Sequence, residues 1–345
     1  VGAAMGEEAA AQGVSVLLGP GLNIKRSPLC GRNFEYFSED PYLAGKMAAA
    51  YVRGIQKNGI AACPKHFAAN SQELRRMASD SVLDERTLRE IYLTGFEIVV
   101  KESAPKTIMS SYNLVNGTYA NENAHLLQDI LRRDWGFTGA VVTDWGGSND
   151  HALGVKNGST LEMPAPGGDA VRELLAAVKS GKITEADVDA RLDELLTLIY
   201  DTHAAVQNHS RSFDADAHHA LARRAAAQSI VLLKNENSLL PLAKGEKVAV
   251  IGDFAQTPRY QGAGSSAVNA LQVDTLLESI KADYSGITFV GYASGFERQG
   301  AADAEKLEEA AALAKKADTV LLCLGLDELR ESEGLDRADM KLAEN

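Results

Sequence analysis

The stretch with the clearest potential for chemistry is GAVVTDWGG, residues 139–147, in which an apolar run leads directly into Asp144. A short apolar run closed by glycines is typical of a buried strand. A carboxylate at the carboxyl end of such a strand is costly to bury unpaired, and in parallel barrels this end carries the active site. Asp144 is therefore a candidate for chemistry, with a helix cap or a salt bridge as the structural alternative.

Other strands expected in the same half of the chain are also followed by polar side chains. These are Arg32, Lys65, His66 and Tyr112. Cations and a hydroxyl around one carboxylate suit a neutral, polyhydroxylated ligand, and Trp145 would offer a flat apolar wall to a sugar ring. The cations are also expected to lower the pKa of Asp144 and keep it ionised, as a nucleophile requires. A purely structural pair at a strand end is the alternative for Lys65 and His66.

A second acidic stretch, GLDELRESEGLDR at 325–337, follows an apolar strand expected at 319–324. Its acids are Asp327, Glu328, Glu331, Glu333 and Asp336. A solvated acidic loop is the ordinary interpretation. Ligand sites, however, form beyond the carboxyl ends of parallel strands, so this loop is a second candidate.

The elements that must position these residues alternate between strand and helix, which indicates parallel sheets built from βαβ units. In the first half, strands are expected at 14–18, 59–67, 107–112, 141–144 and 160–163, and helices at 1–12, 41–57, 84–99, 123–135 and 184–203. Polar groups along one rim favour a barrel, with an open doubly wound sheet as the alternative. The long loop at 23–41 carries several aromatic residues and is expected to be functional.

A smaller α/β pattern follows a polar, irregular segment at 204–213, which we interpret as a linker. Its strands are expected at 230–233, 247–251, 288–292 and 319–324, and its helices at 216–229 and 301–316. The sequence thus predicts a catalytic barrel over 1–203 and a second α/β domain over 214–345. A chain of 345 residues is long enough for both.

Composition excludes several classes of protein. A net charge of −12 disfavours nucleic acid and anionic membranes as partners, and no apolar run approaches the ~20 residues that cross a bilayer. Three cysteines argue against a disulfide framework, and they leave a cytoplasmic, periplasmic or secreted location open. Both ends read as the inside of a longer protein.

Three apparent motifs lack essential parts. VAVIGD at 247–252 followed by GAGSSA at 262–267 has neither a contiguous GxGxxG nor the GK[ST] of a phosphate loop. Cys63 and His66 have no second pair of zinc ligands at suitable spacing. Ser110 and Ser111 lack the GxSxG elbow of serine hydrolases. We therefore expect neither a metal nor a cofactor.

Five motifs in order resemble glycoside hydrolase family 3, the β-glucosidase family: GRNFEYFSEDPYLAG, CPKHFAANSQE, MSSYNLVNG, GFTGAVVTDWGG and ESEGLDR. The resemblance covers nearly the whole chain. It implies a (β/α)8-type TIM barrel, with its N-terminal part missing or irregular, followed by an α/β/α sandwich domain, and a site between the two. It also implies hydrolysis of β-linked sugars with retention, through a covalent glycosyl-enzyme.

The resemblance implies a role for each candidate residue. Asp144 would be the nucleophile, and Glu333 the general acid/base, with Glu331 as the fallback. Neighbouring acids are expected to raise the pKa of Glu333. The residues that would hold sugar hydroxyls, orient Asp144 or line the sugar site are Arg32, Lys65, His66, Tyr112 and Trp145.

The expected function is that of a retaining exo-β-glycosidase, most simply a β-glucosidase acting on a small oligosaccharide or glucoside. A β-xylosidase or another exo-β-glycosidase of the family is the alternative within this class. A non-catalytic carbohydrate-binding relative is the alternative from a different class. A homo-oligomer is compatible with the sequence.

Overall fold

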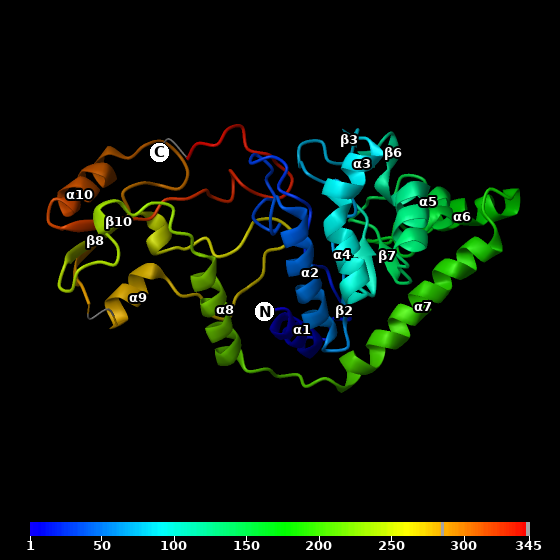
Figure 1. Cartoon of the computed structure of the whole chain (residues 1–345), viewed down its shortest axis with the longest axis horizontal. Helices are drawn as coiled ribbons and strands as arrows, with labels where there is room; N and C mark the ends of the chain where they lie inside the picture. The colour runs from blue at the N-terminus through cyan, green and yellow to red at the C-terminus, as the bar shows by residue number, and fades with distance from the viewer. Residues whose placement is uncertain (284–285, 343–345) are drawn as a thin grey trace. The chain divides into compact units, whose positions relative to one another are not determined.

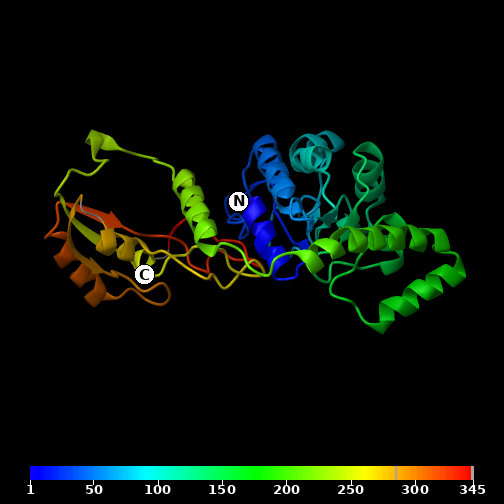
Figure 2. The same cartoon turned by 90° about the horizontal axis from the view of Figure 1, so that it is seen from below.

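A computed structural model of the chain describes residues 1–283 and 286–342, which form two compact units, Val1–Ala222 and Arg223–Asn345 (Figure 1 and Figure 2). Helix α7 (Glu185–Asn208) extends five residues beyond the expected end at 203, so the first half of the expected linker is helical. Residues 209–214 are irregular, and helix α8 (Ala215–Ser229) follows.

The strands of the first unit lie side by side in chain order. They are β1 (Val16–Leu17), β2 (Ala61–Ala62), β4 (Thr107–Met109) and β7 (Ala140–Val142). β1 pairs with β2 and β4 pairs with β7, both in parallel. Parallel bridges join Phe67 to Ser110 and Val142 to Leu161, and so continue the series. This is the order that a barrel of consecutive βα units requires.

Helices surround these strands, and several begin where the sequence predicts. They are α1 (Gly2–Ala11), α2 (Pro41–Gln56), α3 (Glu85–Thr87), η1 (Leu88–Leu93), α4 (Thr94–Ser103), η2 (Ala120–Glu122), η3 (His125–Asp134), α5 (His151–Asn157) and α6 (Gly168–Ser180). The Asp40 carboxylate accepts the backbone N–H of Tyr42 at 2.8 Å and so caps α2. Thr184 and Asp187 form a capping box at the start of α7. Helices α5 and α6 are not among the elements predicted from the sequence.

The core of the first unit lies between the strands and the inner faces of these helices. Figure 1 shows α2 and α4 packed side by side. Phe67 is fully buried and makes edge-to-face contacts with Phe96 and Trp135, with ring centroids 5.3 and 5.9 Å apart. Because Phe67 directly follows His66, this aromatic cluster anchors the end of the second strand. A short separate sheet contains β3 (Asp80–Ser81), β5 (Leu114–Val115) and β6 (Thr118–Tyr119).

The second unit contains a parallel sheet with the strand order β10-β8-β9. Its elements are β8 (Lys247–Ile251), β9 (Thr288–Ala293), β10 (Thr319–Leu322), α9 (Leu276–Asp283), α10 (Ala304–Ala314), η4 (Glu236–Ser238) and η5 (Asp253–Ala255). The chain passes from β8 to β9 on one side and then returns to the other side for β10. The order in which strands are added to the sheet therefore reverses between β8 and β10. Open α/β sheets bind ligands at such a position.

The prediction of a strand at 230–233 is wrong. These four apolar residues lie outside every sheet of the described residues, and their side chains are 61–92% exposed. A strand needs partners for its backbone N–H and C=O groups. An apolar, β-branched run therefore indicates that a segment can form a strand. It does not show whether the fold places another strand beside it.

Candidate active site

Asp144 lies just beyond the carboxyl end of β7, as the sequence predicts, and only 7% of its surface is exposed. Its Oδ1 accepts the backbone N–H of Trp145 at 2.8 Å. Its Oδ2 lies 3.6 Å from Nε2 of His66. Of the two structural alternatives for this residue, a helix cap is not supported by these contacts, and the basic side chain at ion-pair distance from its carboxylate is that of His66.

The expected pKa of Asp144 is wrong in direction. Burial raises the pKa of this carboxyl, and burial outweighs the lowering by the Trp145 amide, Arg32, the Tyr112 hydroxyl and Arg76. The nearby cations act in the predicted direction. Their effect on the pKa is smaller than that of burial, which disfavours the charged carboxylate. The types of residue in the sequence do not reveal how deeply a side chain is buried.

His66 is almost completely buried and is held from two sides. Its backbone N–H donates to Oδ1 of Asn23 at 2.7 Å, and the Asn23 amide donates back to its carbonyl at 2.9 Å. Burial, followed by Arg32, Lys65 and Arg76, lowers the pKa of His66 well below its ordinary value. The ring is therefore neutral. Nδ1 lies 3.3 Å from the Tyr36 hydroxyl and 3.3 Å from Oδ1 of Asn23. If Nδ1 accepts from the hydroxyl, the proton resides on Nε2, the nitrogen that faces Asp144, and if Nδ1 donates to Asn23, Nε2 carries no proton.

Arg32 and Lys65 are joined through Glu35. Arg32 is 1% exposed, and its Nε donates to the Glu35 carboxylate. Nζ of Lys65 lies 3.9 Å from Oε2 of the same carboxylate. A buried cation needs such a partner, so the loop at 23–41 supplies both one charge of the site and the group that neutralises it.

Tyr112 connects the third strand to the residue after Asp144. Its hydroxyl donates to the carbonyl of Trp145 at 2.9 Å. The guanidinium of Arg76 lies 4.6 Å from the centre of the Tyr112 ring, in a cation–π contact, and its Nη1 is 2.7 Å from Oε2 of Glu73. The segment after the second strand thus covers Tyr112 and adds charge near Asp144.

Trp145 is the exception to this burial, because 46% of its surface is exposed. Its backbone is fixed by Asp144 and Tyr112, whereas its indole is open to solvent. An aromatic face beside a strand-end carboxylate is therefore available for contact with a ligand.

The structure brings together the six candidate residues of the first unit, and it adds residues that sequence reasoning missed. The additions are Asn23, Glu35, Tyr36, Glu73 and Arg76. The aromatic residues and unusual length of the loop at 23–41 were the available signal for the first three. Glu73 and Arg76 belong to an irregular segment with no periodic pattern, which gives no such signal.

Glu333 and Glu331 belong to the second unit, in the loop after β10, and they have different partners. Glu331 forms an ion pair with Arg259, with Nη1 and Oε2 2.8 Å apart. Oε2 of Glu333 accepts the backbone N–H of Ser265 at 2.7 Å. Asp327 of the same loop is buried and accepts the N–H groups of Leu329 and Arg330, so it shapes the turn.

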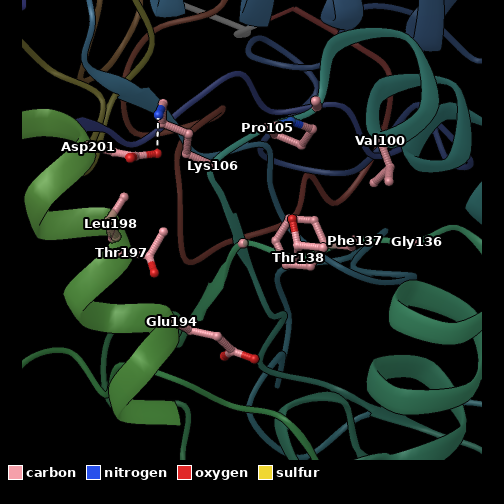
Figure 3. A pocket seen from close by; sticks show the side chains of 12 residues that line it. Val100, Pro105, Lys106, Gly136, Phe137, Thr138, Glu194, Thr197, Leu198 and Asp201 are labelled. Carbon is pink, nitrogen blue, oxygen red and sulfur yellow. Dashed lines mark hydrogen bonds and ion pairs between the residues drawn. The ribbon is translucent and has the colours of Figure 1, made fainter. Parts of the chain in front are cut away.

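A pocket of about 270 Å³ in the first unit lies at the opposite ends of the strands, against α7 (Figure 3). Lys106 and Gly139, which immediately precede β4 and β7, line it. Its charged groups are paired: Lys106 with Asp201, and Glu194 with Arg132. At the amino ends of barrel strands, such pairing is typical of a stabilising contact. Across residues 1–283 and 286–342, no cluster of side chains has the composition of a metal site.

The location and composition of the buried cluster define an α/β protein with a candidate site at the carboxyl ends of parallel strands. Two family profiles match the chain: "Glycosyl hydrolase family 3 N terminal domain" over residues 1–198, and "Glycosyl hydrolase family 3 C-terminal domain" over residues 230–345. The chain belongs to glycosyl hydrolase family 3, and the expected family and two-domain α/β fold are confirmed.

Similar proteins include "Thermostable beta-glucosidase B" of Acetivibrio thermocellus, 47% identical over the whole chain and 46% of that protein. An "Exo-alpha-(1->6)-L-arabinopyranosidase" of Bifidobacterium breve is 46% identical over 98% of the chain and 45% of that protein. The crystal structure of a GH3 beta-glucosidase from Bifidobacterium adolescentis matches with a TM-score of 0.93 and 42% identity, over 99% of this chain and 50% of that one. The chain thus spans about half the length of these relatives. Among the described helices, none has the length and apolar composition to cross a bilayer.

Proposed function

We propose that the protein is a retaining exo-β-glycosidase, a β-glucosidase that releases terminal β-linked glucose from oligosaccharides or glucosides. The observation that carries this proposal is Asp144, a strand-end carboxylate that faces neutral His66 at 3.6 Å within a buried ring of charged groups. Membership of glycosyl hydrolase family 3 supports the reaction class.

In the first step, ionised Asp144 attacks the anomeric carbon, and Glu333 donates its proton to the departing glycosidic oxygen. The glycosidic bond breaks and an ester between the sugar and Asp144 forms. In the second step, the carboxylate of Glu333 takes a proton from water, and the resulting hydroxyl attacks the anomeric carbon. The ester breaks, Asp144 is again a carboxylate, and the configuration of the sugar is retained.

The surrounding residues would bind and orient the sugar. Arg32 and Lys65 are buried cations that can donate to hydroxyl oxygens. With its proton on Nε2, His66 can donate to Asp144 or to a sugar hydroxyl. Tyr112 fixes the turn that carries Trp145. The exposed indole of Trp145 would stack on the apolar face of the ring.

A second candidate activity has nearly equal support from similarity. The relative whose name specifies an α-L-arabinopyranosidase is 46% identical, against 47% for the thermostable β-glucosidase. A β-xylosidase or another exo-β-glycosidase fits the same chemistry. A non-catalytic carbohydrate-binding protein would need no acid/base, and both Asp144 and Glu333 are present.

A panel of aryl glycosides tests the proposal on the full-length protein. The panel contains the β-glucoside, β-xyloside, β-galactoside, N-acetyl-β-glucosaminide and α-L-arabinopyranoside. We expect the highest kcat/KM with the β-glucoside, and for Asp144→Asn a loss of roughly 10⁴-fold or more, on the scale of removing a nucleophile. Asp129→Asn changes a surface aspartate of the same unit and serves as the matched control.

Two results would contradict the proposal in different ways. A higher kcat/KM with the arabinopyranoside would change the assigned substrate and would leave the proposed mechanism unchanged. Turnover by Asp144→Asn near the wild-type rate would remove the nucleophile assignment itself.

A further inference from the structure

The glycine-rich segment GAGSSA, residues 262–267, matches no phosphate-binding motif, and the structure places it against the acidic loop of the second unit. The backbone N–H of Glu333 donates to the carbonyl of Ala263 at 3.1 Å. The backbone N–H of Ser265 donates to Oε2 of Glu333 at 2.7 Å. Both the backbone and the carboxylate of Glu333 are therefore held by main-chain groups of this one segment.

Gly264 lies between these two contacts and leaves no room for a side chain. A Cβ atom at this position would lie 2.4 Å from Cβ of Glu333 and 2.8 Å from its Oε2. The Cβ of Glu333 is close to its own backbone and cannot swing away as the end of a side chain can. Gly264 also has a φ of +108°, a conformation that residues with a Cβ rarely adopt.

Two further side chains fix the segment around Glu333. The amide of Gln261 both donates to the carbonyl of Val268 and accepts its N–H, at 3.0 and 2.8 Å, and so closes the loop at 261–268. Arg259 donates to the carbonyl of Leu326 at 3.1 Å and to the carbonyl and carboxylate of Glu331. Arg259 thus ties the acidic loop to the chain just before the loop at 261–268.

We propose that the loop at 261–268 is a positioning element for the acid/base, in which Gly264 makes room for Glu333 and the Ser265 N–H aims its carboxylate. This inference rests on the proposed function, because it takes Glu333 as the acid/base. A backbone donor suits the role, since it fixes one carboxylate oxygen by a charge-assisted hydrogen bond, and a carboxylate has a second oxygen for proton transfer. Arg259 would support the acidic loop through its contacts with Glu331.

The test uses Gly264→Ala in the full-length protein, with Gly300→Ala as the matched control. Gly300 is in the same unit and has a φ of +107°, and a Cβ at this position would meet no atom within 4 Å. The two glycines have nearly the same positive φ, and only at Gly264 would the added Cβ meet Glu333. Because the loss of proton donation matters most when the leaving group is poor, each variant is assayed with 2,4-dinitrophenyl β-glucoside and with methyl β-glucoside.

For Gly264→Ala we expect kcat/KM to fall about 10²-fold with the poor leaving group, the scale of a misplaced catalytic group. With the activated substrate we expect little change in the first step. Azide should restore part of the turnover and give a β-glucosyl azide, because this anion attacks the glycosyl-enzyme without the help of a general base. Gln261→Leu removes the two bonds that close the loop and should show a weaker form of the same pattern, even if Gly264→Ala folds poorly.

The outcomes separate this inference from the proposed function. If wild type hydrolyses none of the glucosides, or Glu333→Ala lacks the leaving-group dependence, the proposed function fails and the inference fails with it. If Glu333→Ala behaves as an acid/base variant while Gly264→Ala and Gln261→Leu match Gly300→Ala, only the positioning role is overturned. An equal loss for all leaving groups without rescue by azide would likewise show a merely structural role.

Discussion

At the scale of single residues, the proposed role of Asp144 as the nucleophile depends on its ionisation. Burial raises the pKa of its carboxyl, and the Trp145 amide, Arg32, the Tyr112 hydroxyl and Arg76 oppose that rise. A nucleophile acts only when it is ionised. Activity should therefore fall on the acidic side as Asp144 takes up a proton, at a pH above the range of an ordinary aspartate.

Replacing Arg76 with methionine tests this balance. Loss of the cation removes one of the contributions that lower the pKa of Asp144, so the pKa should rise further. The acidic limb of the kcat/KM–pH profile should then move to higher pH. Arg86→Met, which removes the same charge at a side chain that is 82% exposed, should leave the limb in place. An unchanged limb in Arg76→Met would count against Asp144 as the group that sets it.

The two glutamates of the acidic loop can also be separated. Glu331 is paired with Arg259, and Glu333 is held by a backbone N–H. We expect Glu333→Ala to lose roughly 10²- to 10⁴-fold with a poor leaving group, the range for general acid–base catalysis. Glu331→Ala should lose less, and equally for all leaving groups, because it loosens the loop. The reverse pattern in a comparison of aryl and alkyl glucosides would make Glu331 the acid/base.

At the scale of elements, the second strand shows how packing supports chemistry. Lys65 and His66 precede Phe67, which packs against Phe96 on α4 and Trp135 at the end of η3. The fully buried ring thus fixes the strand end to two helices. Trp145, which follows β7, is half-exposed and makes no comparable contribution to the core.

The two aromatic residues should therefore respond differently to truncation. Phe67→Ala should cost about 3–5 kcal/mol of stability, because it leaves a cavity in the core. Trp145→Ala should leave stability nearly unchanged and raise KM, because it removes a surface for the sugar ring. Thermal unfolding and steady-state kinetics of both variants check this prediction. A large loss of stability in Trp145→Ala would show that its ring belongs to the core instead.

At the scale of the whole molecule, the buried site makes the first unit sensitive to pH. The pKa of His66 lies well below 6.5 in the folded state, because burial and the neighbouring Arg32, Lys65 and Arg76 disfavour its charged form. In the unfolded chain the ring binds a proton near pH 6.5. Below that pH the unfolded state gains a proton that folded His66 does not bind, so the contribution of His66 to stability should be fully present above pH 6.5 and should fall as the pH decreases.

The expected slope is about 1.4 kcal/mol per pH unit for this one group. Urea unfolding followed by tryptophan fluorescence reports on the first unit, because both tryptophans of the chain, Trp135 and Trp145, lie there. His66→Gln should remove this part of the slope. His125→Gln, at a side chain that is 46% exposed, should keep it. Equal slopes in wild type and His66→Gln would contradict the burial argument.

Local features of the fold could be predicted from the sequence because they depend on neighbours along the chain. The helices expected from residues 41 and 184 begin at or beside those residues, capped by Asp40 and Thr184, since a cap is a contact over about three residues. The positions of Lys65, His66, Tyr112 and Asp144 at strand ends follow from short apolar runs and the residues that close them. The order of five motifs was enough to predict the family.

Tertiary structure decided what depends on contacts distant in the sequence. The pKa of Asp144 moves opposite to the expectation because burial removes its carboxyl from water. Residues 230–233 do not form a strand because no partner pairs with them in the described part of the chain. Irregular loops bring three further residues into contact with the site, namely Asn23, Glu35 and Arg76. The sequence by itself determined the family and the candidate residues at the strand ends, whereas burial and pairing, which no local pattern encodes, determined the charge and the partners of those residues.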